Sequence, residues 1–215
     1  MTATPARLAV FASGGGSNLQ AIIDHVHTLG AHAPVVLALV VSDRVAAGAL
    51  ARARSAEVPA VWVAKDRSHE LGGILERHAI THIALAGYLR LVPTAVTSAY
   101  RGRIVNVHPA LLPAFGGPGM YGHHVHEAVI QRGARVSGPT VHFVDAHYDE
   151  GPIIAQWPVP VLEQDTAESL AARVLKAEHA LFPRCIEALC AGRITLGDDG
   201  RVHGADALAS PQLPA

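Results

Sequence analysis

Short apolar segments alternate with longer segments of helical spacing along the first half of the chain. The apolar segments are rich in Val, Ile and Leu, as in "RLAVFAS", "VVLALVVS" and "RIVNVH", and they predict strands at 7–13, 35–42, 60–64, 82–87 and 103–108. The segments between them predict helices at 17–30, 46–57, 68–79 and 93–100. Such alternation implies right-handed crossovers, and therefore a doubly wound α/β fold with a mainly parallel, twisted sheet and helices on both faces.

The second half of the chain has a different pattern. A helix is expected at 124–133, followed by two extended runs, 138–145 and 153–161, whose short separation favours an antiparallel pair at the C-terminal edge of the sheet. A long helix is expected at 167–190 and a closing hairpin at 192–202. Because no repeat or linker is evident, the sequence predicts a single domain over residues 1–203 and a flexible tail over 204–215.

Composition excludes several classes of protein. Hydrophobic residues make up 50% of the 215 residues, which is enough for a large core. The formal charge is -1 without a run of like charges, so neither a nucleic acid nor an anionic membrane is an expected partner. The apolar run Val35–Val41 is too short to cross a bilayer, and no signal peptide is evident, so a cytoplasmic location is expected. Cys185 and Cys190 are five residues apart in one expected helix and should not pair.

A glycine-rich turn follows the first expected strand. Gly14–Gly16 precede a helix, with Ser17 and Asn18 where its N-cap is expected. In an open α/β sheet this edge faces the ligand crevice, and free N–H groups at a helix start suit a phosphate. The dinucleotide pattern would need a glycine at Leu19, and no Gly-Lys-Ser/Thr follows, so a phosphate monoester is the favoured ligand. A glycine turn without a ligand is the alternative.

The stretch "NVHPALLPAFGGPGMYGHHVH" begins at the end of the last strand of the first half. Asn106 and His108 alternate with valines there, so both polar side chains should emerge on one side at the carboxyl edge of the sheet. An amide and an imidazole so placed can share one developing oxyanion.

Three further histidines in this stretch raise the question of a metal site. His123 and His126 have helical spacing, and His124 and His126 have the spacing of a strand. Neither pair is accompanied by a cysteine or carboxylate cluster at ligand spacing, so no metal is predicted, and these histidines are expected to be polar groups at a helix start.

Five motifs in order carry a resemblance to a known family. They are "SGGGSNLQA", "LAGYLRLV", "NVHPALLP", "VHFVDAHYDEGPII" and "AEHALFP". Together they resemble the phosphoribosylglycinamide formyltransferases, folate-dependent enzymes of purine synthesis, over about residues 7–195. The chain departs from the family's pattern at Tyr88 and Leu89, where some relatives carry Phe and Met, and in the longer connection at 115–123.

The resemblance implies a catalytic set of Asn106, His108 and Asp149. The glycinamide amine would attack the formyl carbon of the cosubstrate 10-formyltetrahydrofolate, giving a tetrahedral oxyanion held by His108 and Asn106. Asp149 would keep His108 protonated and help to move a proton from the amine to the folate nitrogen through water. The resemblance also implies a cis peptide bond at Leu112–Pro113, which suits a tight turn beside a site.

The same resemblance assigns binding residues. The phosphate and ribose of the substrate are expected at Gly14, Gly15, Gly16, Ser17, Asn18 and Glu178, and the folate at Tyr88, Leu89, Arg90, Leu91, Val92 and Asp145. Two assignments stay open at this stage. Asp145 could instead serve a turn, and His142, on an alternating strand, could be either structural or a support for His108 or the folate.

Other functions fit parts of the sequence. A formyltetrahydrofolate hydrolase or a methionyl-tRNA formyltransferase would share the fold, but these enzymes usually carry an extra domain for which this chain has no room. A phosphate- or nucleotide-binding module would explain the glycine turn but would leave Asn106, His108 and Asp149 without a role. The expected partners are small molecules, and the oligomeric state stays open, with a homodimer as one alternative.

Overall fold

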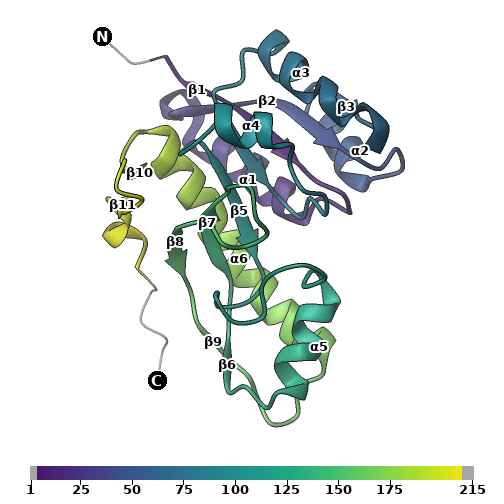
Figure 1. Ribbon diagram of the computed structural model, residues 1–215, viewed down its shortest axis with the longest axis vertical. Helices are drawn as coiled ribbons and strands as arrows, with labels where there is room; N and C mark the ends of the chain where they lie inside the picture. Colours follow the sequence, from purple (N-terminus) through teal and green to yellow (C-terminus); the bar gives the residue numbers. More distant parts are fainter. Residues whose placement is uncertain (1–3, 210–215) are drawn as a thin grey trace.

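The computed structural model describes residues 4–209 (Figure 1). The strands of these residues form one seven-stranded sheet and two small two-stranded sheets. The strands of the large sheet are β1 (Ala6–Phe11), β2 (Val35–Ser42), β3 (Ala60–Trp62), β4 (His82–Leu85), β5 (Ile104–His108), β7 (Thr140–Phe143) and β8 (Ile153–Gln156). The small pairs are β6 (Val136–Ser137) with β9 (Val159–Pro160), and β10 (Thr195–Leu196) with β11 (Val202–His203).

Helices connect these strands. The α-helices are α1 (Ser17–Leu29), α2 (Gly48–Ser55), α3 (Leu71–Arg77), α4 (Thr94–Ala99), α5 (His123–Gln131) and α6 (Ala167–Cys190). The short 3-10 helices are η1 (Gly30–His32), η2 (Lys65–Glu70) and η3 (Ala205–Leu208).

The sheet has the order β3-β2-β1-β4-β5-β7-β8. β1 to β5 pair in parallel, whereas β7 runs antiparallel to both β5 and β8. The predicted parallel sheet with an antiparallel C-terminal edge is therefore confirmed. The second extended run is divided between β8 and β9, and Pro158 lies between these two strands.

Alternate residues of the central strands pack on opposite faces of the sheet. On one face Leu8 and Val10 of β1 contribute to a core cluster with α1, α2 and α6, and on the other Ala9 and Phe11 join a cluster with α3 and α4. A third cluster lies between α5, β9 and the first half of α6, at the end of the molecule away from α3 (Figure 1). Layers of helix, sheet and helix thus cover both faces of the strands.

Most predicted boundaries agree with the structure. The long helix has the predicted bounds, and a capping box between Thr166 and Ser169 explains its sharp start. The stretch expected as one helix at 68–79 instead begins in η2 and continues as α3, with consecutive glycines, Gly72 and Gly73, in the first turn of α3. Both cysteines are free, as predicted.

The end of the chain differs from the expected flexible tail. Residues 205–208 form η3, Leu208 is buried in the core beside α6, and the indole N–H of Trp157 donates to the carbonyl of Leu208 at 3.0 Å. An apolar side chain and a satisfied indole thus fix this segment on the domain. The rest of the predicted tail, 210–215, lies outside the described residues.

Two smaller observations complete the fold. The Leu112–Pro113 peptide bond is cis, as predicted. Among residues 4–209, no helix is both long and apolar enough to cross a membrane.

Candidate active site

A cleft of about 580 Å³ opens at the carboxyl ends of β4 and β5. The predicted site residues that line it are Asn18, Tyr88, Leu89, Arg90, Leu91, Val92, Asn106, His108, Asp149 and Glu178. These residues come from five separate parts of the sequence, so the fold gathers most of the predicted catalytic and folate-binding residues around one cavity. Such crevices outside the carboxyl ends of strands are where open α/β sheets bind ligands.

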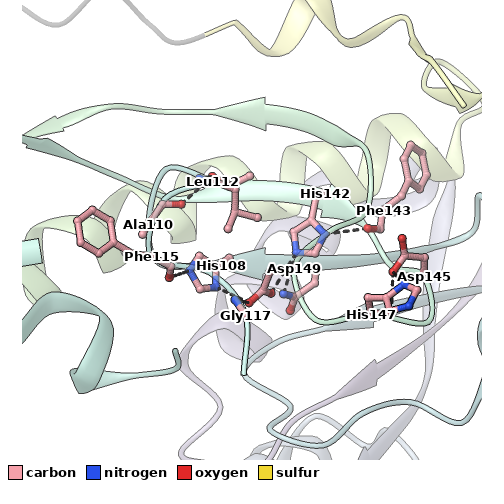
Figure 2. Close-up of polar contacts among 12 residues, drawn as sticks. His108, Ala110, Leu112, Phe115, Gly117, His142, Phe143, Asp145, His147 and Asp149 are labelled. Carbon is pink, nitrogen blue, oxygen red and sulfur yellow. Dashed lines mark hydrogen bonds and ion pairs between the residues drawn. The ribbon is translucent and has the colours of Figure 1, made fainter. Parts of the chain in front are cut away.

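His108 and Asp149 face each other inside the cleft. His108 is the last residue of β5, and Asp149 lies in the loop that joins β7 to β8. The distance from His108 Nδ1 to Asp149 Oδ2 is 3.4 Å, longer than a direct hydrogen bond. The other ring nitrogen, Nε2, donates to the carbonyl of Phe115 at 2.8 Å. Both ring nitrogens of His108 therefore face an oxygen atom, but the oxygen beside Nδ1, Asp149 Oδ2, lies beyond hydrogen-bond distance (Figure 2).

Asn106 pairs with His142 rather than with His108. The two residues are opposite each other in the β5–β7 ladder, and Asn106 Nδ2 lies 3.1 Å from His142 Nε2. Because His142 Nδ1 is 2.8 Å from the carbonyl of Phe143, it must carry the proton, which leaves Nε2 to accept from the amide. One N–H of the Asn106 amide is thus used by His142, and the second stays available in the cleft. His142 Nε2 also lies 3.6 Å from Asp149 Oδ1 (Figure 2).

The loop after β5 contacts both catalytic side chains through its backbone. Besides the Phe115 carbonyl on His108, the N–H of Gly117 donates to Asp149 Oδ2 at 3.0 Å. Between these two residues, a Cβ on Gly116 would lie only 2.5 Å from Leu112 Cδ2 and 3.3 Å from Asp149 Cβ. A side chain at residue 116 would therefore displace the end of the Leu112 side chain and press on Asp149.

Burial and neighbouring charges act in opposite directions on these groups. Burial lowers the pKa of His108 below its usual value, although Asp149 and the Phe115 carbonyl act to raise it. Burial raises the pKa of Asp149, but its polar neighbours, the Gly117 N–H among them, outweigh burial and bring the pKa below its usual value. Desolvation of the imidazole is thus the larger effect in the unliganded protein, and the expectation that Asp149 keeps His108 protonated stays a prediction for the reacting site.

The glycine turn leads into α1, and its cap differs from the prediction. The N-cap is Gly16, with φ +78°, and not Ser17 or Asn18. A Cβ at Gly16 would lie 2.8 Å from the Cα of Ala49, so both its backbone angle and its close contact with α2 require glycine. The first hydrogen bond back to the turn comes from the N–H of Gln20, which leaves the N–H groups before it for a ligand.

Asn18 lies in the first turn of α1 and is bonded to Glu178 of α6. Its Nδ2 donates to Glu178 Oε2 at 2.6 Å, and both side chains are buried in the cleft wall. Burial raises the pKa of Glu178, while Asn18 acts to lower it. Asn18 Oδ1 has no hydrogen-bond partner among the described residues. A buried acceptor beside a carboxyl group can accept a hydrogen bond from a hydroxyl group of a ligand.

Comparisons with known proteins agree with this geometry. Residues 6–186 match the model of a family described as formyl transferase. The chain belongs to the formyl transferase family. It is 45% identical over 201 residues to the chloroplastic phosphoribosylglycinamide formyltransferase of Vigna unguiculata, covering 90% of this chain but 64% of that protein. The phosphoribosylglycinamide formyltransferase of Haemophilus influenzae is 36% identical, with 90% of this chain and 91% of that protein covered.

Solved structures give the same result for the fold. The crystal structure of the phosphoribosylglycinamide formyltransferase from Anaplasma phagocytophilum matches with a TM-score of 0.88 and 34% identity, covering 99% of this chain and 100% of that one. The resemblance read from the five motifs and the expected fold are therefore both confirmed.

One residue of the predicted folate set does not belong to the cleft of this formyl transferase. Asp145 Oδ1 accepts from the N–H of His147 at 2.8 Å, as in an Asx-turn (Figure 2). Asp145 is not among the cleft-lining residues. The assignment of Asp145 to the folate is not supported, and its alternative role in a turn is the one that the structure describes.

The histidines of α5 are divided between the cleft and the surface. His123 and His126 line the cleft, whereas His124 does not. Burial lowers the pKa of His126 to about 4, and its Nδ1 has no partner among the described residues. Within residues 4–209, no group of three or more His, Cys, Asp or Glu side chains is arranged to hold a metal ion.

Two features of the site could not be read from the sequence. His142 was left between a structural and a supporting role, and its pairing with Asn106 depends on the β5–β7 register. The contacts of Phe115 and Gly117 use backbone atoms, which carry no sequence signal. The glycines of residues 116–122 indicated a turn there but not its contact with the catalytic side chains.

Proposed function

We propose that this formyl transferase moves the formyl group of 10-formyltetrahydrofolate to the amine of glycinamide ribonucleotide. The observation that carries the proposal is the cluster of Asn106, His108, His142 and Asp149 in the cleft beside the Asn18–Glu178 pair. The names of the relatives support the same reaction. The chain spans 64% of the length of the Vigna protein, so the site residues of this chain carry the proposal.

The acceptor is assigned to the side of the cleft formed by α1 and α6. The N–H groups of Gly14 to Asn18 would bind its phosphate at the start of α1. The ribose hydroxyls would bond to Asn18 Oδ1 and to Glu178, which are buried and face the cleft. This placement directs the glycinamide amine towards His108.

The formyl donor is assigned to the loop after β4. Tyr88 to Val92 line the cleft, with Leu91 47% exposed and Val92 buried, so the loop offers both backbone groups and apolar surface to a flat ring. Tyr88 is held edge-on against Phe11, with ring centroids 5.3 Å apart. The pterin would lie against this loop, with the formyl group towards Asn106.

The chemistry then depends on the protonation of His108. Burial keeps the resting imidazole mainly neutral near pH 7, with the proton on Nε2 and a lone pair on Nδ1. When the amine attacks the formyl carbon, Nδ1 would accept a proton from the nitrogen, directly or through water. The resulting imidazolium would be stabilised by Asp149 and by the Phe115 carbonyl.

The negatively charged oxygen of the tetrahedral intermediate would lie next to one positively charged group and one neutral hydrogen-bond donor. The imidazolium of His108 and the second N–H of the Asn106 amide would stabilise the oxyanion. Collapse of the intermediate breaks the bond from the formyl carbon to the folate nitrogen, and the proton held by His108 passes to that nitrogen. The products are the formylated amine and tetrahydrofolate, with no net proton released by the transfer.

The experiment is a transfer assay with purified protein. Formyl-glycinamide ribonucleotide is measured by mass spectrometry and tetrahydrofolate by absorbance, with and without the ribonucleotide. Formation of both products only when the ribonucleotide is present supports the proposal. Release of formate and tetrahydrofolate without it would indicate a hydrolase, and no reaction in either case would reject the proposal. A cytoplasmic location and a homodimer stay predictions from the sequence.

A further inference from the structure

Asp43 is a buried acidic residue that lies behind the cleft and has no part in the chemistry above. It follows the last residue of β2, and its side chain is 5% exposed. It does not line the cleft, yet its two carboxylate oxygens bond to two residues that position the cleft wall. Burying a carboxylate lowers the stability of the fold unless the group is paired and hydrogen-bonded, so a buried Asp43 with two such partners suggests a specific role.

The first oxygen of the carboxylate connects to the loop after β4 through Ser13. Ser13 Oγ donates to Asp43 Oδ1 at 2.5 Å, and the same hydroxyl accepts from the N–H of Leu89 at 2.9 Å. A serine hydroxyl has a single proton. Because Ser13 donates that proton to Asp43, its oxygen lone pairs are free to accept the hydrogen bond from the Leu89 N–H. Ser13 N–H also donates to the carbonyl of Gly87 at 3.0 Å. The end of β1 thus fixes the start of this loop at two points.

The second oxygen connects to the same loop through a side chain. Arg90 Nε lies 2.8 Å from Asp43 Oδ2, and Arg90 lines the cleft. This contact is an ion pair. The Arg90 side chain makes no hydrogen bond within residues 4–209, so its terminal nitrogens stay available at the cleft. Burial raises the pKa of Tyr88 to about 12, and the negative charge of Asp43 adds to this effect.

We propose that Asp43 is a positioning residue for the formyl donor, holding the Leu89 backbone through Ser13 and the Arg90 guanidinium directly. The inference rests on the proposed function, which assigns the donor to the loop of Tyr88 to Val92. Asp43 acts on the donor side of the cleft, whereas within residues 4–209 neither the acceptor's binding residues nor the catalytic cluster forms a hydrogen bond or ion pair with its carboxylate. Its loss should therefore affect the two substrates unequally.

The test is Asp43→Asn in the full-length protein. The amide keeps an oxygen for Ser13 but places its N–H groups towards Arg90 and removes the charge. We expect the KM for 10-formyltetrahydrofolate to rise by about 10-fold, which is 1.4 kcal/mol, with kcat and the KM for the ribonucleotide within about twofold. In Arg90→Gln the donor KM should rise similarly, and Asp43→Asn/Arg90→Gln should add little to it, because the two residues act through one contact.

Asp165 provides a matched control. It also pairs with an arginine, Arg173, its side chain is 4% exposed against 5% for Asp43, and it lies outside the cleft. Both Asp165→Asn and Asp43→Asn should lower the melting temperature, but Asp165→Asn should not raise the donor KM. Equal losses in kcat and in both KM values for Asp43→Asn would indicate a general structural role and overturn the proposal.

A second variant keeps the proposal testable if Asp43→Asn does not fold. Ser13→Ala removes the link to the Leu89 N–H and leaves the Asp43–Arg90 pair in place. A donor KM raised a few-fold, with the ribonucleotide KM unchanged, supports the proposal, and an unchanged donor KM overturns it. Failure of the wild-type protein to transfer formyl to the ribonucleotide would instead reject the proposed function, so the two failures are distinct.

Discussion

His108 is a residue on which burial and charge compete. Its side chain is 3% exposed, which favours the neutral ring, while Asp149 and the Phe115 carbonyl favour the charged one. An imidazole with its pKa lowered by burial, but with acceptors beside both nitrogens, can gain a proton when negative charge develops nearby. The resting and reacting states of the site therefore differ in one proton.

The pH dependence of Asp149→Asn tests this competition. If neutral His108 is the active form in the free enzyme, kcat/KM falls as the pH drops through the pKa of His108, which lies below 6.5. Removing the charge of Asp149 removes a group that raises this pKa, so the acid limb should move to lower pH. The maximal rate should fall roughly 10²- to 10⁴-fold, because the imidazolium loses its partner. An acid limb that stays in place or moves to higher pH in steady-state assays would contradict the assignment.

Truncation of the two polar residues of β5 tests the oxyanion site. His108→Ala and Asn106→Ala should each lower kcat by roughly 10²- to 10³-fold, as expected for the loss of one oxyanion partner. Both residues end a strand whose backbone pairing is unchanged by the substitution, so circular dichroism and the melting temperature should show a folded protein. Turnover close to that of the wild type in both purified variants would reject their role.

At the scale of elements, the site depends on how closely helices and turns approach the sheet. The turn from β1 into α1 passes against α2 at Gly16, two residues before Asn18, which lines the cleft. A side chain at residue 16 would force α1 and α2 apart and would move Asn18, which lies in the first turn of α1. The geometry of the acceptor site is thus set partly by a contact that no substrate makes.

Gly16→Ala is the corresponding variant. The added Cβ would overlap Ala49 in a backbone conformation that L-residues avoid, so we expect the free energy of unfolding to fall by about 1–3 kcal/mol. The KM for the ribonucleotide should rise because the start of α1 shifts. Gly14 is the matched control, since a Cβ there meets no atom within 4 Å, and Gly14→Ala should change stability by only about 0.5 kcal/mol. Equal denaturation midpoints for the two variants would contradict this argument.

At the scale of the whole molecule, the last described helix completes the core. Leu208 of η3 is 5% exposed and packs in the same cluster as α6, although the sequence placed it in a flexible tail. We expect Leu208→Ala to lower the free energy of unfolding by about 2–5 kcal/mol, as large-to-small changes in a core do. Leu162, which is 52% exposed, gives the control, because Leu162→Ala should cost only about 0.5 kcal/mol. Chemical denaturation measures both, and similar values would show that η3 is not part of the core.

The sequence was informative where a pattern repeats and uninformative where one contact decides. Apolar periodicity predicted the alternation of strands and helices and the bounds of α6, because burial on a sheet face or helix face recurs at a fixed spacing. It could not predict the strand order, the capping of α1 by Gly16, or the packing of Leu208. Each of these depends on residues far away in the chain, such as Ala49 for Gly16 and Trp157 for the η3 segment.

The same distinction applies to the site. The order of five motifs indicated Asn106, His108 and Asp149, and the cleft contains all three. Asp145 is not among the residues that line the cleft, although its motif neighbours are, and its own side chain accepts from the N–H of His147. The link from Asp43 to the loop after β4 had no sequence signal, since a carboxylate at the end of a strand is as easily a surface group.

The bond between Asn18 and Glu178 joins residues that are 160 positions apart in the chain. A ribosome makes the protein from its N-terminus, so the glycine turn and β1 emerge long before α6. Until α6 has been made and has docked, the cleft lacks the wall that carries Glu178. On the proposed assignment of Glu178 to the acceptor, the ribonucleotide would stabilise the chain only after α6 has docked, when synthesis is nearly finished.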